Sequence, residues 1–322
     1  MHIALITPYG PEHQNGNWHT AARWTAFLRE AGHRVDVSTA WNGEPADLMI
    51  ALHARRSAPS IQAFAVKHPD KPLIVVLTGT DLYRDIRHDA DAQQSLKLAH
   101  RLVVLQEKGV EELVPELAHK ARVIYQSAPD IPRQPLSQDT FEVLVIGHLR
   151  EEKDPFRSAL AAALLPGHSH IRITHLGRAL SGEMEAKAKE LQTHIPRWRW
   201  MDEVPHKEVM DRLSRAHLMI VSSLMEGGAN VICEALAAGV PVIASDISGN
   251  IGMLGKDYPG YYPVGDEHQL AQVLSRAESD ENFYAGLAGL CRTRRGLMTP
   301  EREASSVRKL IAEFETPIIQ QL

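Results

Sequence analysis

The stretch SSLMEGGANVICEALAAGVPVIAS, residues 222–245, places a Glu-Gly-Gly loop before a short helix and ends in an apolar strand. The helix is predicted over 229–238 and stops at Gly239. Its buried stripe is formed by Ile232, Ala235 and Leu236. The first N–H groups of a helix lack intrahelical partners, and glycines let a phosphate approach them closely. The stretch therefore predicts a strand, a helix and an anion site at the helix start.

Two glutamates flank this predicted anion site. Glu226 precedes the helix, whereas Glu234 lies within it, four residues after Asn230 and on the same face. A carboxylate one turn beyond a bound phosphate is placed to accept hydrogen bonds from a ribose diol. Glu226, on the other side of the anion, is placed to hold a sugar hydroxyl. Taken singly, each also fits a plainer interpretation, with Glu226 ending a strand and Glu234 a solvated helix charge.

The bulk composition excludes several classes of protein. The chain has 322 residues, enough for two domains, and 44% are hydrophobic. Its net charge of -5, with acids and bases interspersed, gives no basic surface for nucleic acid. No apolar run approaches the roughly 20 residues of a membrane span, and the first residues lack the pattern of a signal peptide. Two cysteines, Cys233 and Cys291, favour a reduced, cytoplasmic protein without disulfides.

Short apolar runs alternate with amphipathic segments along the chain. The first half contains HIALIT, RVDVS, DLMIAL, PLIVVLT, RLVVLQ and ARVIY, and the second FEVLVIG, IRITHLG, WRWMDEV, LMIVSS and PVIAS. Such runs, separated by helical stretches, indicate parallel strands buried on both faces. The predicted fold class is α/β, with two Rossmann-like, doubly wound parallel-sheet domains facing a cleft.

Three prolines in residues 127–140 interrupt the alternation and indicate a linker. We expect an N-terminal domain over 1–130, a linker over 131–139 and a C-terminal domain over 140–298. The remaining segment is 299–322.

Ligands of open parallel sheets bind at the carboxyl ends of the strands. The segments at these positions are PYGPEHQNGN, HARRS and GTD in the first half and HLREEKD, GRALSG and SLMEGGAN in the second. They are rich in glycine, arginine, histidine and lysine. This composition indicates a site for an anionic ligand.

The run EGGANVICEALAAGVPVIAS resembles the nucleotide-sugar signature of the two-domain, metal-independent glycosyltransferases typified by sucrose synthase and glycogen synthase, which have the GT-B fold. The resemblance implies Glu234 as the ribose ligand and Glu226 as a sugar ligand. It also implies that a short backbone segment binds the sugar and diphosphate: Gly227, Gly228, Ala229 and Asn230. A UDP-sugar is then a co-substrate, and no separate cofactor is implied. The resemblance further implies that the segment from Thr299 forms a helix returning toward the N-terminal domain.

The segment IGHLREEKDP, residues 146–155, resembles the second anion-binding element of the same family. Three positions match: Gly147, Leu149 and Lys153. His148 stands where the family has arginine, and Arg150 is a candidate to supply the missing charge. A departing nucleoside diphosphate develops negative charge that fixed cations stabilise. We therefore assign catalytic roles to Lys153, Arg150 and Glu226 and donor binding to His148, with solvated helix charges as the alternative for the two cations.

Further candidates lie outside these two elements. MDEVPHKEV resembles the family's base-facing loop and implies uracil near Glu203 and Val204. Gly16 keeps the family's glycine after the first strand and is assigned to the nucleotide-sugar site. The acceptor candidates follow strands of the first half: Asn17, His19, Arg55, Arg56, Thr78 and Asp81. For His19 the alternative is a role at the helix start, and for the two arginines it is pairing with surface acids.

The motifs NGNWHTAARW, GEPADLMIALHARRS, VVLTGTDLYRD, VIYQSA and GHLREEKDP together resemble the selenosugar synthases of selenoneine biosynthesis, over the chain up to about residue 265. The resemblance implies selenophosphate as acceptor and a UDP-hexose such as UDP-N-acetylglucosamine as donor. The products implied are a selenosugar, UDP and phosphate. A selenium anion is nucleophilic near neutral pH, so no carboxylate base is required. Asp81, the one base candidate there, fits a structural role or a sugar contact.

The sequence bears on four other functions. A dinucleotide-dependent oxidoreductase is disfavoured because no Gly-x-Gly-x-x-Gly follows a strand. Metal dependence is disfavoured because Asp89 and Asp91 lie in a polar helical stretch, where solvation explains them. A glycosyltransferase with a hydroxyl or thiol acceptor, or a non-catalytic two-lobed binding protein, stays open.

Overall fold

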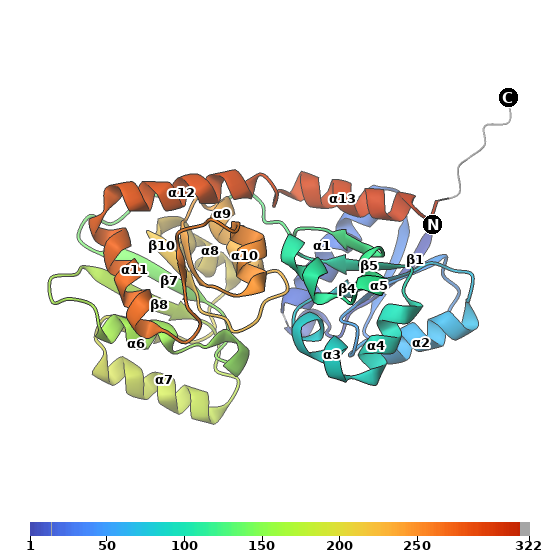
Figure 1. Ribbon diagram of the computed structural model, residues 1–322, viewed down its shortest axis with the longest axis horizontal. Helices are drawn as coiled ribbons and strands as arrows, with labels where there is room; N and C mark the ends of the chain where they lie inside the picture. Colours follow the sequence, from blue (N-terminus) through green and yellow to red (C-terminus); the bar gives the residue numbers. More distant parts are fainter. Residues whose placement is uncertain (14, 316–322) are drawn as a thin grey trace. The chain divides into compact units, whose positions relative to one another are not determined.

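The computed structural model describes residues 1–13 and 15–315, which form two compact units. Unit 1 combines Met1–Gln126 with the segment from Pro300 onward, and unit 2 is Ser127–Thr299. In Figure 1 unit 1 runs from blue to green and adds the red helix α13. Residues 316–322, within the segment expected to return as a helix, lie outside the described residues.

Unit 1 is built on a parallel sheet of order β2-β1-β3-β4-β5-β6. Its strands are β1 His2–Ile6, β2 Arg34–Ser38, β3 Leu48–Leu52, β4 Leu73–Leu77, β5 Arg101–Val104 and β6 Ala121–Val123. Alternate residues of β3 enter different core clusters, Met49 with Phe64 of α2, and Ile50 with Trp24 of α1. Both faces of the strand are therefore covered, which explains its unbroken apolar run.

The helices of unit 1 are α1 Gly16–Glu30, α2 Ala58–Lys67, α3 Ile86–His88, α4 Ala90–Leu98, α5 Pro115–Ala118 and α13 Pro300–Ala312, with short helical turns η1 Pro11–His13, η2 Asp81–Asp85 and η3 Glu107–Glu112. Asn15 caps α1 by accepting a hydrogen bond from the Trp18 N–H at 3.1 Å. Helix α13 packs against α1. Its buried Glu303 accepts hydrogen bonds from Trp24 Nε1 at 2.9 Å and Arg23 Nε at 3.0 Å. These bonds attach the late helix α13 to the first helix of the chain.

Unit 2 contains a second parallel sheet, of order β12-β11-β10-β7-β8-β9. Its strands are β7 Phe141–Ile146, β8 Ile171–Leu176, β9 Trp198–Met201, β10 Leu218–Val221, β11 Val242–Ser245 and β12 Tyr261–Tyr262. The prediction of two doubly wound parallel sheets is thereby confirmed. Strand β12 was not predicted, because two tyrosines between Gly260 and Pro263 carry no strand periodicity.

The helices of unit 2 are α6 Arg157–Ala163, α7 Gly182–His194, α8 His206–Arg215, α9 Asn230–Ala237, α10 Ser248–Leu254, α11 Glu267–Ser279 and α12 Glu281–Arg295, with a short turn η4 Glu151–Lys153. Helix α9 begins and ends one residue inside the predicted range 229–238. Its buried residues include the predicted Ile232, Ala235 and Leu236. Within the described ranges, every helix is too short or too polar to cross a membrane.

Candidate active site

In unit 2 the loops after β7 and β10 lie together, since these strands are neighbours in the sheet. Ser222 Oγ donates to the carbonyl oxygens of Lys153 at 2.8 Å and Asp154 at 3.0 Å. The Leu224 N–H donates to the Glu152 carbonyl at 2.9 Å. The two segments that the sequence predicted to bind anions are thus brought side by side at the carboxyl end of the sheet.

Lys153 and Glu226, two of the residues predicted to be catalytic, form an ion pair through Nζ and Oε1. The same carboxylate oxygen accepts a hydrogen bond from Ser223 Oγ at 2.6 Å. Glu226 is 9% exposed, so its charge is held mainly by these two partners. The Lys153 ammonium is therefore fixed at the loop junction, where it is placed to face an anionic ligand.

Two glycines hold these loops in place by close backbone approach. A Cβ at Gly177, where φ is +146°, would lie 2.5 Å from the carbonyl carbon of Gly147. A Cβ at Gly249, in α10, would lie 2.8 Å from the carbonyl carbon of Glu226 and nearer still to its oxygen. Only glycine fits at either position without moving the loop.

His148 does not replace the charge of the family's arginine. Its Nδ1 accepts a hydrogen bond from the Arg178 N–H at 3.1 Å, and burial lowers the pKa of the imidazole. His148 is consequently neutral near pH 7. Arg150 is exposed, and Arg178, from the loop after β8, lies 3.8 Å from the Glu203 carboxylate. The positive charges next to His148 thus belong to Arg150 and Arg178, and not to His148 itself.

The start of α9 provides backbone donors and one unusual side chain. Gly227 and Gly228 lead to Ala229, the N-cap residue, which has no side-chain acceptor for the first turn. The buried Oδ1 of Asn230 has no hydrogen-bond partner within the described part of the chain. An unsatisfied buried amide is costly and is explained where a ligand completes the site. The arrangement fits an anion at the helix start.

Glu234 lies one turn further along α9 and is not a free solvated charge. Its Oε1 is 3.3 Å from His206 Nε2, and this hydrogen bond raises the pKa of His206. Val204, half-buried, and the exposed Glu203 precede α8, which begins at His206. Sequence reasoning missed His206, although the segment MDEVPHKEV that contains it was singled out.

In unit 1 the predicted residues after β1 belong to the first turn of α1. Gly16 and Asn17 follow the capping Asn15, and the His19 N–H donates to the Asn15 carbonyl at 3.0 Å. His19 is half-buried at this helix start. These positions agree with the plainer interpretation of His19 and leave its side chain as a candidate acceptor contact.

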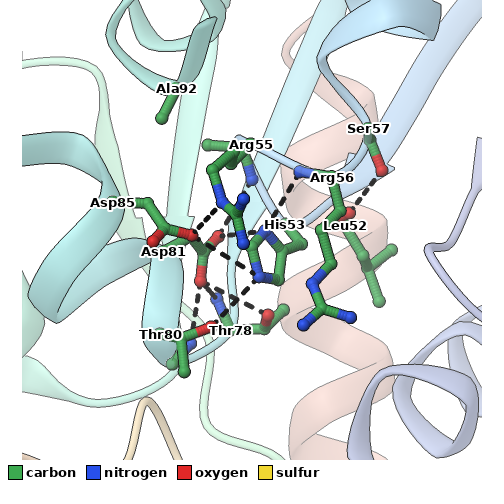
Figure 2. A network of polar contacts seen from close by, with 12 residues as sticks. Leu52, His53, Arg55, Arg56, Ser57, Thr78, Thr80, Asp81, Asp85 and Ala92 are labelled. Carbon is green, nitrogen blue, oxygen red and sulfur yellow. Dashed lines mark hydrogen bonds and ion pairs between the residues drawn. The ribbon is translucent and has the colours of Figure 1, made fainter. Parts of the chain in front are cut away.

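The two arginines after β3 have different surroundings, as Figure 2 shows. Arg55 Nε donates to Asp85 Oδ2 at 2.8 Å, and this bond raises the pKa of Arg55. Arg56 is exposed, and its guanidinium carbon lies 5.0 Å from the centre of the Tyr9 ring. Among the residues that the structure describes, Arg56 forms no ion pair. Pairing with an acid, the alternative left open for both, thus holds for Arg55, and Arg56 is the arginine placed to meet an anion.

Asp81 is fully buried, which favours the structural role considered for it over a contact with the acceptor. Its carboxylate accepts hydrogen bonds from the N–H groups of Ala54, Thr78 and Gly79, each at 2.9 Å. These three backbone donors satisfy the hydrogen-bonding needs of the buried carboxylate. Asp81 therefore connects the loop after β3 to the loop after β4. This is a structural role, the first of the two interpretations given for it from the sequence. Thr78 stays half-buried beside it.

His53 was missed by sequence reasoning although it follows β3 directly in the quoted HARRS. It is 3% exposed, and its φ of 72° is positive. In the described chain the other non-glycine residue with positive φ is Asp154, at the loop junction of unit 2. Such backbone conformations cluster at functional sites.

No cluster of three or more His, Cys, Asp or Glu side chains suited to a metal ion occurs among residues 1–13 and 15–315. Asp89 caps α4 by accepting from the Ala92 N–H at 2.9 Å, and Asp91 accepts from Gln62 Nε2 at 2.9 Å. Asp89 is thus a helix cap rather than a merely solvated charge.

Solved structures share the fold of this chain. Anabaena HepE in complex with UDP-glucose matches with a TM-score of 0.75 and 15% identity, over 97% of this chain and 100% of that chain. Sucrose-phosphate synthase from Thermosynechococcus elongatus matches with a TM-score of 0.78 and 17% identity, over 97% and 98%. These similarities establish the GT-B fold, as predicted.

Sequence comparison gives the family. Glycosyltransferase 1 domain-containing protein 1 of Xenopus tropicalis is 22% identical over 267 residues, 74% of this chain and 77% of that protein. A glycosyltransferase named for teichuronic acid biosynthesis, TuaC of Bacillus subtilis, is 34% identical over 79 residues, and the chain spans only 20% of its length. The family model described as "Glycosyl transferases group 1" matches residues 126–288, just over half of the chain. The chain therefore belongs to the glycosyl transferases of group 1.

Proposed function

We propose that this protein transfers a hexose, N-acetylglucosamine by preference, from a UDP-sugar to selenophosphate in selenoneine biosynthesis. The anomeric C–O bond to UDP breaks and a C–Se bond forms, with UDP leaving. Water then takes the phosphoryl group from selenium, giving the selenosugar and phosphate. The proposal combines a donor site in unit 2 with an acceptor site in unit 1.

The donor half rests on the charges and donors around α9. Lys153, fixed by Glu226, supplies a cation for the leaving diphosphate, and exposed Arg150 adds a second. The uncapped start of α9 and the Asn230 amide supply hydrogen-bonding groups. Glu234 would accept from the ribose diol in place of His206. HepE, which has the same fold, was crystallised with UDP-glucose, and this supports the same donor class here.

Glu226 has a second role in this proposal. One carboxylate oxygen is occupied by Lys153 and Ser223, and a carboxylate has a further oxygen that can accept from a sugar hydroxyl. Glu226 would then bind the sugar and Lys153 the diphosphate, so that one ion pair contacts both parts of the donor. Val204 and Gly16 stay proposed contacts of the base and the nucleotide sugar.

The acceptor half of the proposal rests on the surroundings of two carboxylates that follow β4, Asp81 and Asp85. Asp81 is buried and saturated by backbone donors, and Asp85 is paired with Arg55, so neither is placed to deprotonate an alcohol. A selenium anion attacks without deprotonation. Arg56, exposed beside Tyr9, is suited to the phosphate part of the acceptor. This combination favours selenophosphate over a hydroxyl acceptor.

The observation that carries the proposal is the Lys153–Glu226 pair beside the uncapped start of α9. The test is mass spectrometry of products from UDP-N-acetylglucosamine mixed with selenophosphate. Release of UDP together with a selenium-containing sugar is expected. Transfer to a sugar alcohol or a thiol alone would refute the acceptor assignment, and binding of UDP-sugars with no turnover under any acceptor would identify a binding protein instead.

A further inference from the structure

His53 occupies a strained position at the carboxyl end of the unit 1 sheet. It is the first residue after β3, its φ is 72°, and its imidazole is 3% exposed. Non-glycine residues adopt this conformation at a cost in conformational energy, and they keep it where the surroundings over-determine it. The hydrogen bonds of the His53 imidazole therefore explain why the residue keeps this conformation.

The hydrogen bonds of His53 fix the tautomer of its ring (Figure 2). The Arg56 N–H donates to Nδ1 at 3.3 Å, so this nitrogen carries a lone pair. The hydrogen of the ring is then on Nε2. Nε2 lies 3.1 Å from Thr80 Oγ1 and donates to it. The imidazole is thus a bridge between the backbone of its own loop and the hydroxyl of the next loop.

This arrangement orients the Thr80 hydroxyl. Because Oγ1 accepts from His53, its own hydrogen points away from the ring. Thr80 is partly exposed, and its hydroxyl makes no other hydrogen bond within the described residues. The nearest carboxylates accept hydrogen bonds from other donors. Asp81 accepts from three backbone N–H groups, and Asp85 accepts from Arg55. Thr80 therefore presents a directed O–H donor at the sheet edge.

We propose that His53 is a positioning residue that makes Thr80 a hydrogen-bond donor to a phosphate oxygen of the acceptor. The inference rests on the proposed function and adds two residues to its acceptor site. Arg56 stands three residues after His53 and supplies the matching positive charge. An oxyanion accepts from such a donor, whereas the Thr80 hydroxyl is not a base and cannot take the proton that an alcohol must lose. The pair thereby selects an anionic acceptor.

The first experiment compares Thr80→Val, which removes the hydroxyl at similar volume, with Thr80→Ser, which keeps it. We expect Thr80→Val to lower kcat/KM for selenophosphate by about 10- to 100-fold, the effect of a lost bond to a charged group. Thr80→Ser is expected to stay within about 3-fold of wild type, and the KM for the UDP-sugar is expected to stay constant in both.

The second experiment tests His53 through Thr80. His53→Leu is expected to reproduce the loss of Thr80→Val, and His53→Gln, whose amide N–H replaces Nε2–H, to recover part of it. Because the two residues act as a unit, the double variant His53→Leu/Thr80→Val should be no worse than Thr80→Val. The pH profiles of wild type and His53→Gln are expected to be parallel. Thermal melting of each variant separates loss of folding from loss of function.

Each opposite result overturns the inference in a recognisable way. If wild type makes the selenosugar but Thr80→Val does so equally well, or the two losses multiply, the inference fails and the proposed function stands. Loss of the acid limb of the pH profile in His53→Gln would make His53 a base rather than a positioning residue. If wild type makes no selenosugar, the proposed function fails, and calorimetric binding of inorganic phosphate still decides: weaker binding to Thr80→Val supports the directed donor, and unchanged or undetectable binding refutes it.

Discussion

Substituting Gly249 by alanine tests whether the position of Glu226 controls turnover. The new Cβ would lie 2.8 Å from the carbonyl carbon of Glu226, against an ordinary contact that begins at 3.4 Å. The Glu226 backbone must therefore retreat by at least about 0.6 Å, and by more at its oxygen. A displacement of 1 Å at a catalytic group costs about 100-fold in rate, so we expect kcat to fall by about 10- to 100-fold.

The cost in stability is expected to be smaller than the cost in rate. Overpacking of one methyl group destabilises by about 1–3 kcal/mol, because the loop can shift to relieve it. Gly286→Ala, in the interior of α12, is the matched control: its Cβ would meet nothing within 4 Å. That variant should keep full activity and gain up to about 1 kcal/mol of stability from helix propensity.

UDP release under saturating donor and acceptor, together with thermal melting, measures both effects. A Gly249→Ala enzyme that remains within about 2-fold of the wild-type kcat would refute the argument that the close backbone contact sets the position of Glu226. A variant that loses activity only in proportion to its unfolded fraction would assign the glycine to folding alone.

Three further predictions concern charged groups. Lys153→Met should lower kcat by about 100- to 1,000-fold, whereas Glu234→Ala should mainly weaken UDP-sugar binding; steady-state kinetics with calorimetry separates the two, and an unchanged kcat in the lysine variant excludes its leaving-group role. Arg56→Ala should raise the KM for selenophosphate without changing that for the donor. Arg55→Ala, which removes one of the two arginines paired with the buried Asp85, should mainly lower the melting temperature; equal kinetic effects of both would contradict the distinction. The hydrogen bond to Glu234 raises the pKa of His206 above 6.5. Protonated His206 therefore stabilises the fold fully below pH 6.5, and this contribution is lost as the pH rises through the raised pKa. Wild type should therefore exceed His206→Asn in melting temperature at about pH 5.5 and match it at about pH 8.5, and a constant difference would argue against the linkage.

The predicted strands came from local apolar runs, and these were sufficient for the two sheets. The burial of both faces of β3 leaves no place for polar residues, so its sequence carries the signal by itself. Helix α9 was equally clear, since its stripe, the glycines before it and Gly239 all lie within one stretch. Strand β12 had no such signal, because its two residues are held by pairing with β11.

The site was predictable only where one segment held the information. Glu226 and Glu234 lie in one motif, but the ion pair of Glu226 with Lys153 joins residues 73 apart in sequence. His53 and Thr80 are 27 residues apart, and each alone is an ordinary loop residue. Their relation depends on two strands being neighbours and on a φ value that favours glycine. Contacts of this kind follow from the tertiary arrangement, for which neither segment has a local signature.

The attachment of α13 to α1 has a consequence for the order in which the chain folds during synthesis. Residues 127–299 form unit 2 without interruption, so that unit is complete when Pro300 is added. Unit 1 begins first but still lacks α13, and Trp24 Nε1 has no Glu303 carboxylate to receive its hydrogen bond. Although domains generally fold from the N-terminus during translation, here the first unit cannot be completed until the segment from Pro300 has been made. The first 126 residues should therefore reach full protection from proteolysis only after that segment has been released.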